Sequence, residues 1–319
     1  MNENTDRIIT FEELAYKAIA KAQSRIFKRE AGVLQDKNPE NLHQMRVGIR
    51  RLRSAIASFI LAVNLPEVVT AKNFNKINRP LGKLRDLDVL LDILANNYRP
   101  HLSTKEQIIL DRILKSLKKQ RQHRLKQVRK TLKSKLYLEI KRELTDWLKQ
   151  PEYQISSSLS VNYLVPDLLL PQVCQFLAHQ GWFVGVEIKS GQVSLPEILN
   201  MSAIEQLLAP EDIFLHDLRK LAKKTRYSLE LFSQLYGDTY RHYLQQVKAV
   251  QEILGHIQDT HVMREVLERN LRSSINNKMP QLANLLLQIR YQKWLEWQQL
   301  QTLFLKEQTR REFRQAIIN

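Results

Sequence analysis

Two short segments of the chain carry basic side chains at matching positions. HQMRVGIRRLR at residues 43–53 holds one histidine and four arginines but no acid, and HDLRKLAKKTR at 216–226 repeats its pattern. The matching members are 173 residues apart: His43, Arg46, Arg50, Arg51 and Arg53 correspond to His216, Arg219, Lys223, Lys224 and Arg226. Guanidinium and ammonium groups form charge-assisted hydrogen bonds with anionic oxygens. Both segments therefore indicate the binding of an anion.

On a helical wheel, the cations of each segment form a stripe beside the apolar face. In the first segment the stripe consists of His43, Arg46, Arg50 and Arg53. The apolar face beside it consists of Met45, Ile49, Leu52, Ile56 and Phe59. In the second segment the stripe consists of His216, Arg219, Lys223 and Arg226, and the apolar face beside it consists of Leu218, Ala222, Leu229 and Phe232. Arg51 and Lys224 point more towards solvent. Like charges in a seam between helices repel and lose hydration unless an anion neutralises them. An anion-binding groove is favoured over a solvated basic surface, because the stripe occurs twice with no acidic partner inside it.

A second motif recurs at the same offset. LGKLRDLDVL at 81–90 and LGHIQDTHVM at 254–263 share the pattern L-G-x-[LI]-x-D-x-x-V-[LM]. Two motifs with one offset of 173 residues predict a duplicated unit and an approximate two-fold axis. Gly82 and Gly255 are expected to permit close helix approach. Asp86 and Asp259 are expected to form a salt bridge or hydrogen bond that orients a neighbouring arginine or caps an adjacent helix; the alternative is a Mg²⁺ ligand or a catalytic carboxylate.

The elements that position these motifs are helices. Helical patterns cover 10–35, 39–63, 66–96 with Pro80 as a kink, 104–149, 211–236, 238–270 and 279–316. Five prolines break 150–210, where 180–195 is the one candidate for a strand or hairpin. We predict an all-α fold of two four-helix bundle-like halves in a single domain over 1–319. Its first repeat spans 5–150, a connecting segment with a short hairpin spans 151–210, and the core of the second repeat spans 211–319.

The composition of the chain excludes several classes of protein. With 43% hydrophobic residues and 319 residues in all, it is globular and not disordered. The formal charge of +17 favours a polyanionic partner. The single cysteine, Cys174, excludes an internal disulfide and is expected to be buried. There is no signal peptide or membrane-spanning run, so membrane insertion is not expected. The expected location is the cytoplasm.

Further cations lie on other predicted helices. Lys17, Lys21, Arg25 and Lys28 align on one side of the first helix. Between Arg112 and Arg142 thirteen Lys or Arg residues face one acid, Glu139. Lys115 and Lys119 share a face of this long helix. Because the helix is basic all round, part of its charge must simply be solvated.

These motifs resemble the CHAD family, the "conserved histidine α-helical domain". The resemblance covers residues 5–316 and rests on H-x-x-R-x-x-x-R-R-x-R, its downstream basic echo and L-G-x-L-R-D-x-D-V. It implies two four-helix bundles around a pseudo-two-fold axis, with a basic central channel that binds inorganic polyphosphate. The E-x-E-x-K signature of a fused CYTH domain is absent, so a stand-alone member is expected. The second copy departs from the pattern: it has Lys223 and Lys224 for the arginine pair, and Gln258 and His261 where the first has Arg85 and Asp88. The 180–195 insertion has no counterpart in the family pattern.

The residues expected to bind polyphosphate come from both repeats. They are Lys17, Lys21, Arg25, Lys28, His43, Arg46, Arg50, Arg51, Arg53, Lys83, Arg85, Lys115, Lys119, His216, Arg219, Lys220, Lys223, Lys224, Arg226 and Lys248. Polyphosphate is a flexible chain with about one negative charge per phosphate, so its receptor needs many donors along a track. His43 and His216 either donate to phosphate or lock a helix junction.

The leading hypothesis is a non-catalytic polyphosphate-binding module without a cofactor, with other polyanions as further partners and association with polyphosphate granules as one option. The alternative is an RNA-binding helical protein, since +17 alone would support it equally. Against RNA, aromatic residues are not interleaved with the basic stripes. A phosphoanhydride-processing enzyme is disfavoured, because the sequence has no P-loop, no HExxH and no carboxylate cluster suited to two metals.

Overall fold

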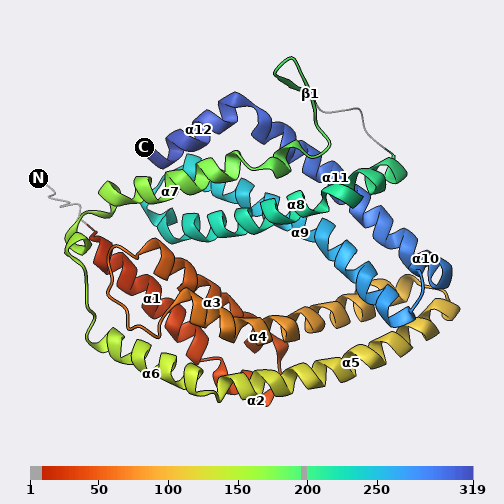
Figure 1. Ribbon diagram of the computed structural model, residues 1–319, viewed down its shortest axis with the longest axis horizontal. Coiled ribbons are helices and arrows are strands. Elements are labelled where there is room, and N and C mark those ends of the chain that lie inside the picture. Colours follow the sequence, from red (N-terminus) through yellow and green to blue (C-terminus); the bar gives the residue numbers. More distant parts are fainter. Residues whose placement is uncertain (1–8, 195–199, 319) are drawn as a thin grey trace, which may run out of the picture. The chain divides into compact units, whose positions relative to one another are not determined.

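The computed structural model describes residues 9–194 and 200–318, without the side chains of residue 192 and residues 209–212. Helices account for nearly all of this part of the chain, and the only strands in it form one two-stranded hairpin (Figure 1). The predicted all-α fold is confirmed. The chain forms two compact units. Unit 1 holds the described residues up to Ile93 together with Leu114–Val165, and unit 2 holds Leu94–Ile113 and the described residues from Pro166 onward.

Unit 1 is built from the first six α-helices. They are α1 (Phe11–Phe27), α2 (Glu30–Gln35), α3 (Pro39–Ser58), α4 (Ala71–Asp92), the part of α5 (Thr104–Leu132) from Leu114 onward, and α6 (Lys135–Lys149). Helix α3 packs against α1 on one side and α4 on another. Its predicted apolar face is confirmed, because Met45, Ile49, Leu52 and Phe59 are fully buried, although Ile56 is only half-buried.

Polar caps set several helix boundaries in unit 1. The Thr10 hydroxyl accepts a hydrogen bond from the backbone of Glu13 (3.3 Å), and the Asn38 side chain accepts one from Glu40 (2.8 Å). The single helix predicted over 104–149 is wrong. It is two helices, because the Ser134 hydroxyl accepts from the backbone of Tyr137 (3.3 Å) and caps a new helix, α6. The helix predicted over 10–35 is likewise divided, and Asp36 ends α2 in the left-handed conformation (φ 58°).

Residues 150–210 are more helical than their five prolines predict. Helix α7 (Val161–Leu177) runs through both Pro166 and Pro171, and α8 (Met201–Phe232) begins ten residues before the predicted start at 211; Pro196 lies outside the described residues. Each internal proline removes a backbone hydrogen bond. Burial of apolar side chains on one face of α7 offsets that loss: Val165, Leu169, Val173 and Phe176. On the same helix Cys174 is exposed, so its predicted burial is wrong.

The predicted hairpin is confirmed over part of 180–195. A short 3-10 helix, η4 (Gln180–Phe183), precedes β1 (Glu187–Lys189), which pairs with β2 (Gln192–Ser194). Ser190 and Gly191 both have positive φ (51° and 75°), as a two-residue hairpin turn requires.

The C-terminal helices complete unit 2. They are α9 (Asp238–Leu271), the short α10 (Ile275–Lys278), α11 (Pro280–Leu305) and α12 (Glu307–Ile318). Helix α9 packs against α8 and α11. Gln301 of α11 donates to the carbonyls of Trp182 (2.8 Å) and Val184 (2.9 Å), so a buried amide holds the η4 segment on the core. Across residues 9–194 and 200–318, no helix combines the length and the apolarity that crossing a bilayer needs.

Candidate functional site: two basic clusters

The first basic cluster comprises His43, Arg46, Arg50 and Arg53 of α3 with Arg85 of α4. All five side chains are half-buried. Burial lowers the pKa of His43, and the positive charges of Arg85, Arg50 and Arg46 lower it further, while Glu40 acts in the opposite direction. The guanidinium groups therefore lie close enough to the imidazole to act on it. The structure brings together the stripe of α3 and a cation of the L-G element.

Arg53 shows the electrostatic state of this cluster. Its Nε is buried and has no hydrogen-bond partner among the described residues, and burial lowers the pKa of the guanidinium. An arginine nevertheless stays charged at any ordinary pH. A half-buried guanidinium whose Nε has no hydrogen-bond partner has lost hydration at that atom without compensation, which an anion could supply. Arg53 is thus the member of the first cluster with the clearest uncompensated burial.

The glycines of the two L-G elements lie against arginines. Gly82 is buried in α4, and a Cβ added to it would meet Nη1 of Arg46 from α3. Gly255 is buried in α9, and a Cβ there would lie 3.3 Å from Nε of Arg219 from α8. These glycines were expected to permit close helix approach; the group nearest to each of them is instead the head of an arginine side chain from the neighbouring helix. The same pair of motifs meets in the same way in both units.

The second basic cluster comprises His216, Arg219, Lys223 and Arg226 of α8. Nδ1 of His216 is buried without a hydrogen-bond partner among the described residues. Nη2 of Arg219 lies 3.7 Å from Oδ1 of Asp259, and Nε of Arg226 lies 3.3 Å from Oε1 of Glu230. The expectation of a stripe without acidic partners is wrong here, because neighbouring turns and α9 supply them. For Asp259, the predicted role as an ion-pair partner of an arginine is confirmed.

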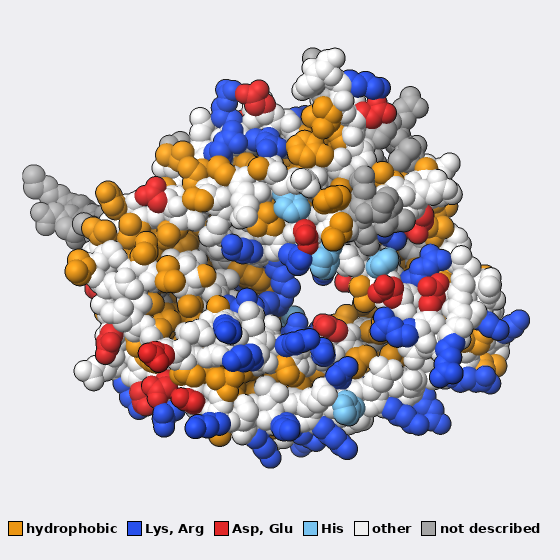
Figure 2. Space-filling model, viewed as in Figure 1, with side chains coloured by type: hydrophobic (Ala, Val, Ile, Leu, Met, Phe, Trp, Pro, Cys, Tyr) orange, Lys and Arg blue, Asp and Glu red, His pale blue; other side chains and the backbone are white. Residues whose placement is uncertain are grey.

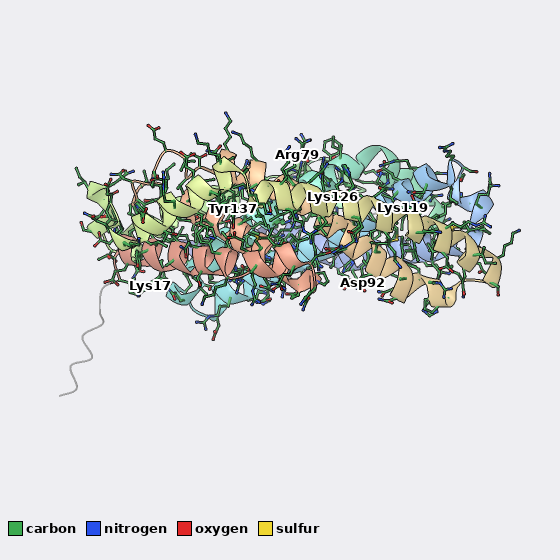
Figure 3. All side chains as sticks on the ribbon, turned by 90° about the horizontal axis from the view of Figure 1, so that it is seen from below. Lys17, Arg79, Asp92, Lys119, Lys126 and Tyr137 are labelled. Atoms are coloured by element: carbon green, nitrogen blue, oxygen red, sulfur yellow. The ribbon has the colours of Figure 1, made fainter. Side chains whose placement is uncertain are left out.

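Two of the other predicted binding lysines lie beside acids. Lys220 forms a 2.6 Å ion pair with Asp217, and Lys248 lies 3.9 Å from Glu252. Arg51 is half-buried, and its charge acts on Arg25 of α1. The remaining lysines are exposed: Lys17, Lys21, Lys28, Lys83, Lys115, Lys119 and Lys224. Figure 3 looks onto α5, where Lys119 and Lys126 lie, and Figure 2 shows Lys and Arg side chains gathered over this helix.

Sequence reasoning missed an ion triad in unit 1. Arg121 of α5 binds Asp36 through two hydrogen bonds (2.6 and 2.7 Å) and Asp88 through Nε (2.6 Å). The three side chains are at most 18% exposed, so this is a buried network. Burial raises the pKa of Asp88, although the hydrogen bond and charge of Arg121 and the charge of Arg85 oppose that shift. The triad fixes α5 to α4 next to Arg85. Asp88 is visible in the L-G element, but no pattern in the sequence points to Asp36.

Other kinds of site are not apparent among the described residues. No group of three or more His, Cys, Asp or Glu side chains in 9–194, 200–208 and 213–318 could hold a metal ion. A cavity of about 730 Å³ at the start of α8 is lined by Asn200, Glu205, Arg264 and their neighbours, and none of the predicted binding residues lines it.

Comparisons with known proteins identify the same architecture. The family description "CHAD domain" matches residues 17–268. The crystal structure of the CHAD domain from the plant Ricinus communis aligns with a TM-score of 0.56 and 22% sequence identity, over 97% of this chain and 91% of that one. PptA from Streptomyces chartreusis aligns with a TM-score of 0.60 and 13% identity, over 97% of this chain and 99% of that one. At such identities the likeness shows the fold alone. No curated protein matches the chain.

Proposed function

Because the chain belongs to the CHAD domain family, we propose that it binds inorganic polyphosphate through its two basic clusters, without chemistry of its own. The observation that carries the proposal is Arg53, a half-buried cation whose Nε has no partner among the described residues, beside the other cations of the first cluster. Such a group supports binding of a ligand that is anionic along its whole length.

The chemistry of the clusters suits a chain of phosphates. Guanidinium groups bind phosphate oxygens in a bidentate manner, whereas lysine ammonium groups supply compact charge. Polyphosphate has no base edges to recognise, so it needs donors in a row and no stacking platform. Tyr227, which lies under Arg226 at 4.7 Å, is itself buried and cannot stack on a nucleobase. This favours polyphosphate over the alternative ligand, RNA.

A competition experiment tests the class of ligand. Labelled long-chain polyphosphate is bound to the protein and challenged with RNA, DNA and short phosphates at one salt concentration. We expect polyphosphate to bind more tightly than RNA of equal charge, and its affinity to fall steeply as salt rises, because binding releases counterions. RNA binding that is equal or tighter at physiological salt would favour the alternative.

Two finer expectations remain predictions. One is the pseudo-two-fold axis with a shared basic channel, which the family resemblance implies. The other is the absence of catalysis, which is checked by incubating the protein with polyphosphate, with and without Mg²⁺, and measuring released phosphate and chain length.

A further inference from the structure

The two repeated motifs meet through one contact in each unit. In unit 1 the head of Arg46 lies against Gly82, and in unit 2 the head of Arg219 lies against Gly255. Both partners are shifted by 173 residues between the copies. The contact thus joins the basic stripe to the L-G element, and it explains why the two motifs occur together.

We propose that Gly82 and Gly255, each with the aspartate four residues later, form seats that position the guanidinium groups of Arg46 and Arg219 for phosphate and require arginine at these positions. The inference rests on the proposed function for its ligand. The seat itself belongs to the ligand-free protein.

The aspartates supply the second half of each seat. Residues four apart lie on the same face of a helix. In unit 2, Asp259 follows Gly255 by one turn of α9, and its Oδ1 lies 3.7 Å from Nη2 of Arg219. Asp86 occupies the corresponding position after Gly82 on α4. The spacing L-G-x-x-x-D therefore provides a flat surface without a side chain and, one turn on, an anionic anchor.

Glycine is required here for space and not for backbone conformation. Gly82 and Gly255 lie inside α4 and α9, and the glycines with positive φ are others, Gly185 and Gly191. Glycine in a helix interior is less favourable than alanine. Its presence at the same place in both copies therefore needs another reason. The arginine heads supply that reason: Nη1 of Arg46 overlaps the position of the missing Cβ at Gly82, and Nε of Arg219 lies 3.3 Å from that position at Gly255.

The cationic positions differ between the copies in a way that fits a seat. Arg50 and Arg51 are replaced by Lys223 and Lys224, whereas Arg46 is matched by Arg219. A planar guanidinium can lie flat on a glycine and still present its other edge to phosphate. A lysine ammonium is a compact charge on a flexible stem and gains nothing from such a surface.

The central test is Gly82→Ala. The group that a methyl would displace is the far end of a flexible side chain, so the arginine can swing away and the helix keeps its packing. We expect about a tenfold loss of affinity for polyphosphate in titration calorimetry, because one charge-assisted contact is misplaced. The melting temperature should not fall. Gly255→Ala should also lower the affinity for polyphosphate, but by a smaller factor, because its added Cβ would lie 3.3 Å from Nε of Arg219.

Lysine substitutions test the requirement for arginine. Arg46→Lys should lower the affinity about as much as Gly82→Ala, whereas Arg50→Lys should change it little, because the second copy has lysine at that position. The double variant Gly82→Ala/Arg46→Lys should bind no more weakly than Arg46→Lys alone. If Gly82→Ala lowers the affinity of Arg46→Lys as much as it lowers that of the wild type, Gly82 does not act through Arg46 and the proposed seat is wrong.

Gly48→Ala is the matched control. Gly48 lies on the same helix as Arg46 but faces α1, where a Cβ would come within 2.8 Å of Cγ1 of Ile26. This variant should lower the melting temperature and leave the affinity of the folded protein unchanged. If Gly82→Ala behaves like Gly48→Ala, the glycine serves helix packing alone and the proposal fails.

A ligand-free measurement separates the seat from the proposed function. In protein labelled with [¹⁵N]arginine, the Nε–H of Arg46 should exchange with solvent more slowly in the wild type than in Gly82→Ala; Arg46→Lys assigns the signal. Equal exchange rates would refute the seat. Slow exchange in a wild-type protein that does not bind polyphosphate would instead keep the seat and refute the proposed function.

Discussion

The double variant Arg50→Gln/Lys223→Gln is expected to bind polyphosphate at least about 100-fold more weakly than the wild type. Each charge-assisted contact with phosphate contributes roughly 1.5–3 kcal/mol, and the two losses add if the residues act independently. Glutamine keeps the polarity and much of the length of both side chains. Calorimetric titration with one defined chain length measures the effect.

The control for this variant is Lys130→Gln/Lys133→Gln, which removes the same formal charge. Both lysines are exposed, at or just beyond the end of α5. An exposed charge contributes about 0–1 kcal/mol, so this variant should lose less than half as much binding free energy. Without ligand, Arg50→Gln/Lys223→Gln should melt no lower than the wild type, because fewer like charges crowd the clusters. Equal losses of affinity in the two variants would mean that net charge, and not the clusters, binds polyphosphate.

The largest expected change in stability belongs to Arg121→Gln. This substitution leaves the buried carboxylate of Asp88, only 5% exposed, without its cation, and removes the two hydrogen bonds to Asp36. Breaking a buried ion pair from one side costs about 3–5 kcal/mol. Urea unfolding at pH 7 measures this free energy, and Arg142→Gln is the control. Arg142 pairs with Glu143 but is 68% exposed, so solvent screens this pair and its loss should change the free energy of unfolding far less than Arg121→Gln does.

The loss of unfolding free energy in Arg121→Gln should become smaller as the pH falls. Burial already raises the pKa of Asp88, and the loss of Arg121 removes the hydrogen bond and the charge that oppose this rise most, so that only the charge of Arg85 still opposes it. A carboxyl whose pKa is higher in the folded than in the unfolded state favours the folded state at low pH, and this contribution is lost as the pH rises through the folded-state value. The difference in unfolding free energy between Arg121→Gln and the wild type should therefore decrease on acidification. A constant gap between pH 7 and pH 5 would show that Asp88 is not the uncompensated charge.

The helical fold could be predicted from the sequence because periodicity reports burial directly. Met45, Ile49 and Leu52 repeat at helical spacing, and all three are fully buried. Boundaries depend on weaker signals. Ser134 lies between two helices: its hydroxyl donates to the carbonyl of Thr131 at the end of α5 and accepts from the backbone of Tyr137 at the start of α6. Pro166 is tolerated because its helix has a well-buried face. Local rules for serine and proline cannot weigh such tertiary burial.

The site was predictable to the extent that it lies on single helices. The stripe of α3 follows from 3.6-residue spacing, and its half-buried position was deduced from the adjacent apolar face. Contacts between helices were not predictable in the same way. Glu230 is four residues from Arg226 and could have been noticed, but Asp259 reaches Arg219 from another helix. Asp36 was hidden altogether, because its role depends on the left-handed turn that ends α2.

The path of the chain through the two units has a consequence for its synthesis. Residues 94–113 belong to unit 2 but leave the ribosome before the second half of unit 1. Their buried acid, Glu106, accepts hydrogen bonds from the backbone of Gln281 (2.8 Å) and Leu282 (3.1 Å), which are translated about 175 residues later. At ~5–20 residues per second the delay is roughly 10–35 s. Leu110 and Ile113 of the same segment end up buried, and the rest of unit 2, from Pro166 onward, is translated after them. For the same reason a fragment that starts at Pro166 is not an intact half: it lacks the carboxylate that caps α11 and the apolar turn of α5 that carries it.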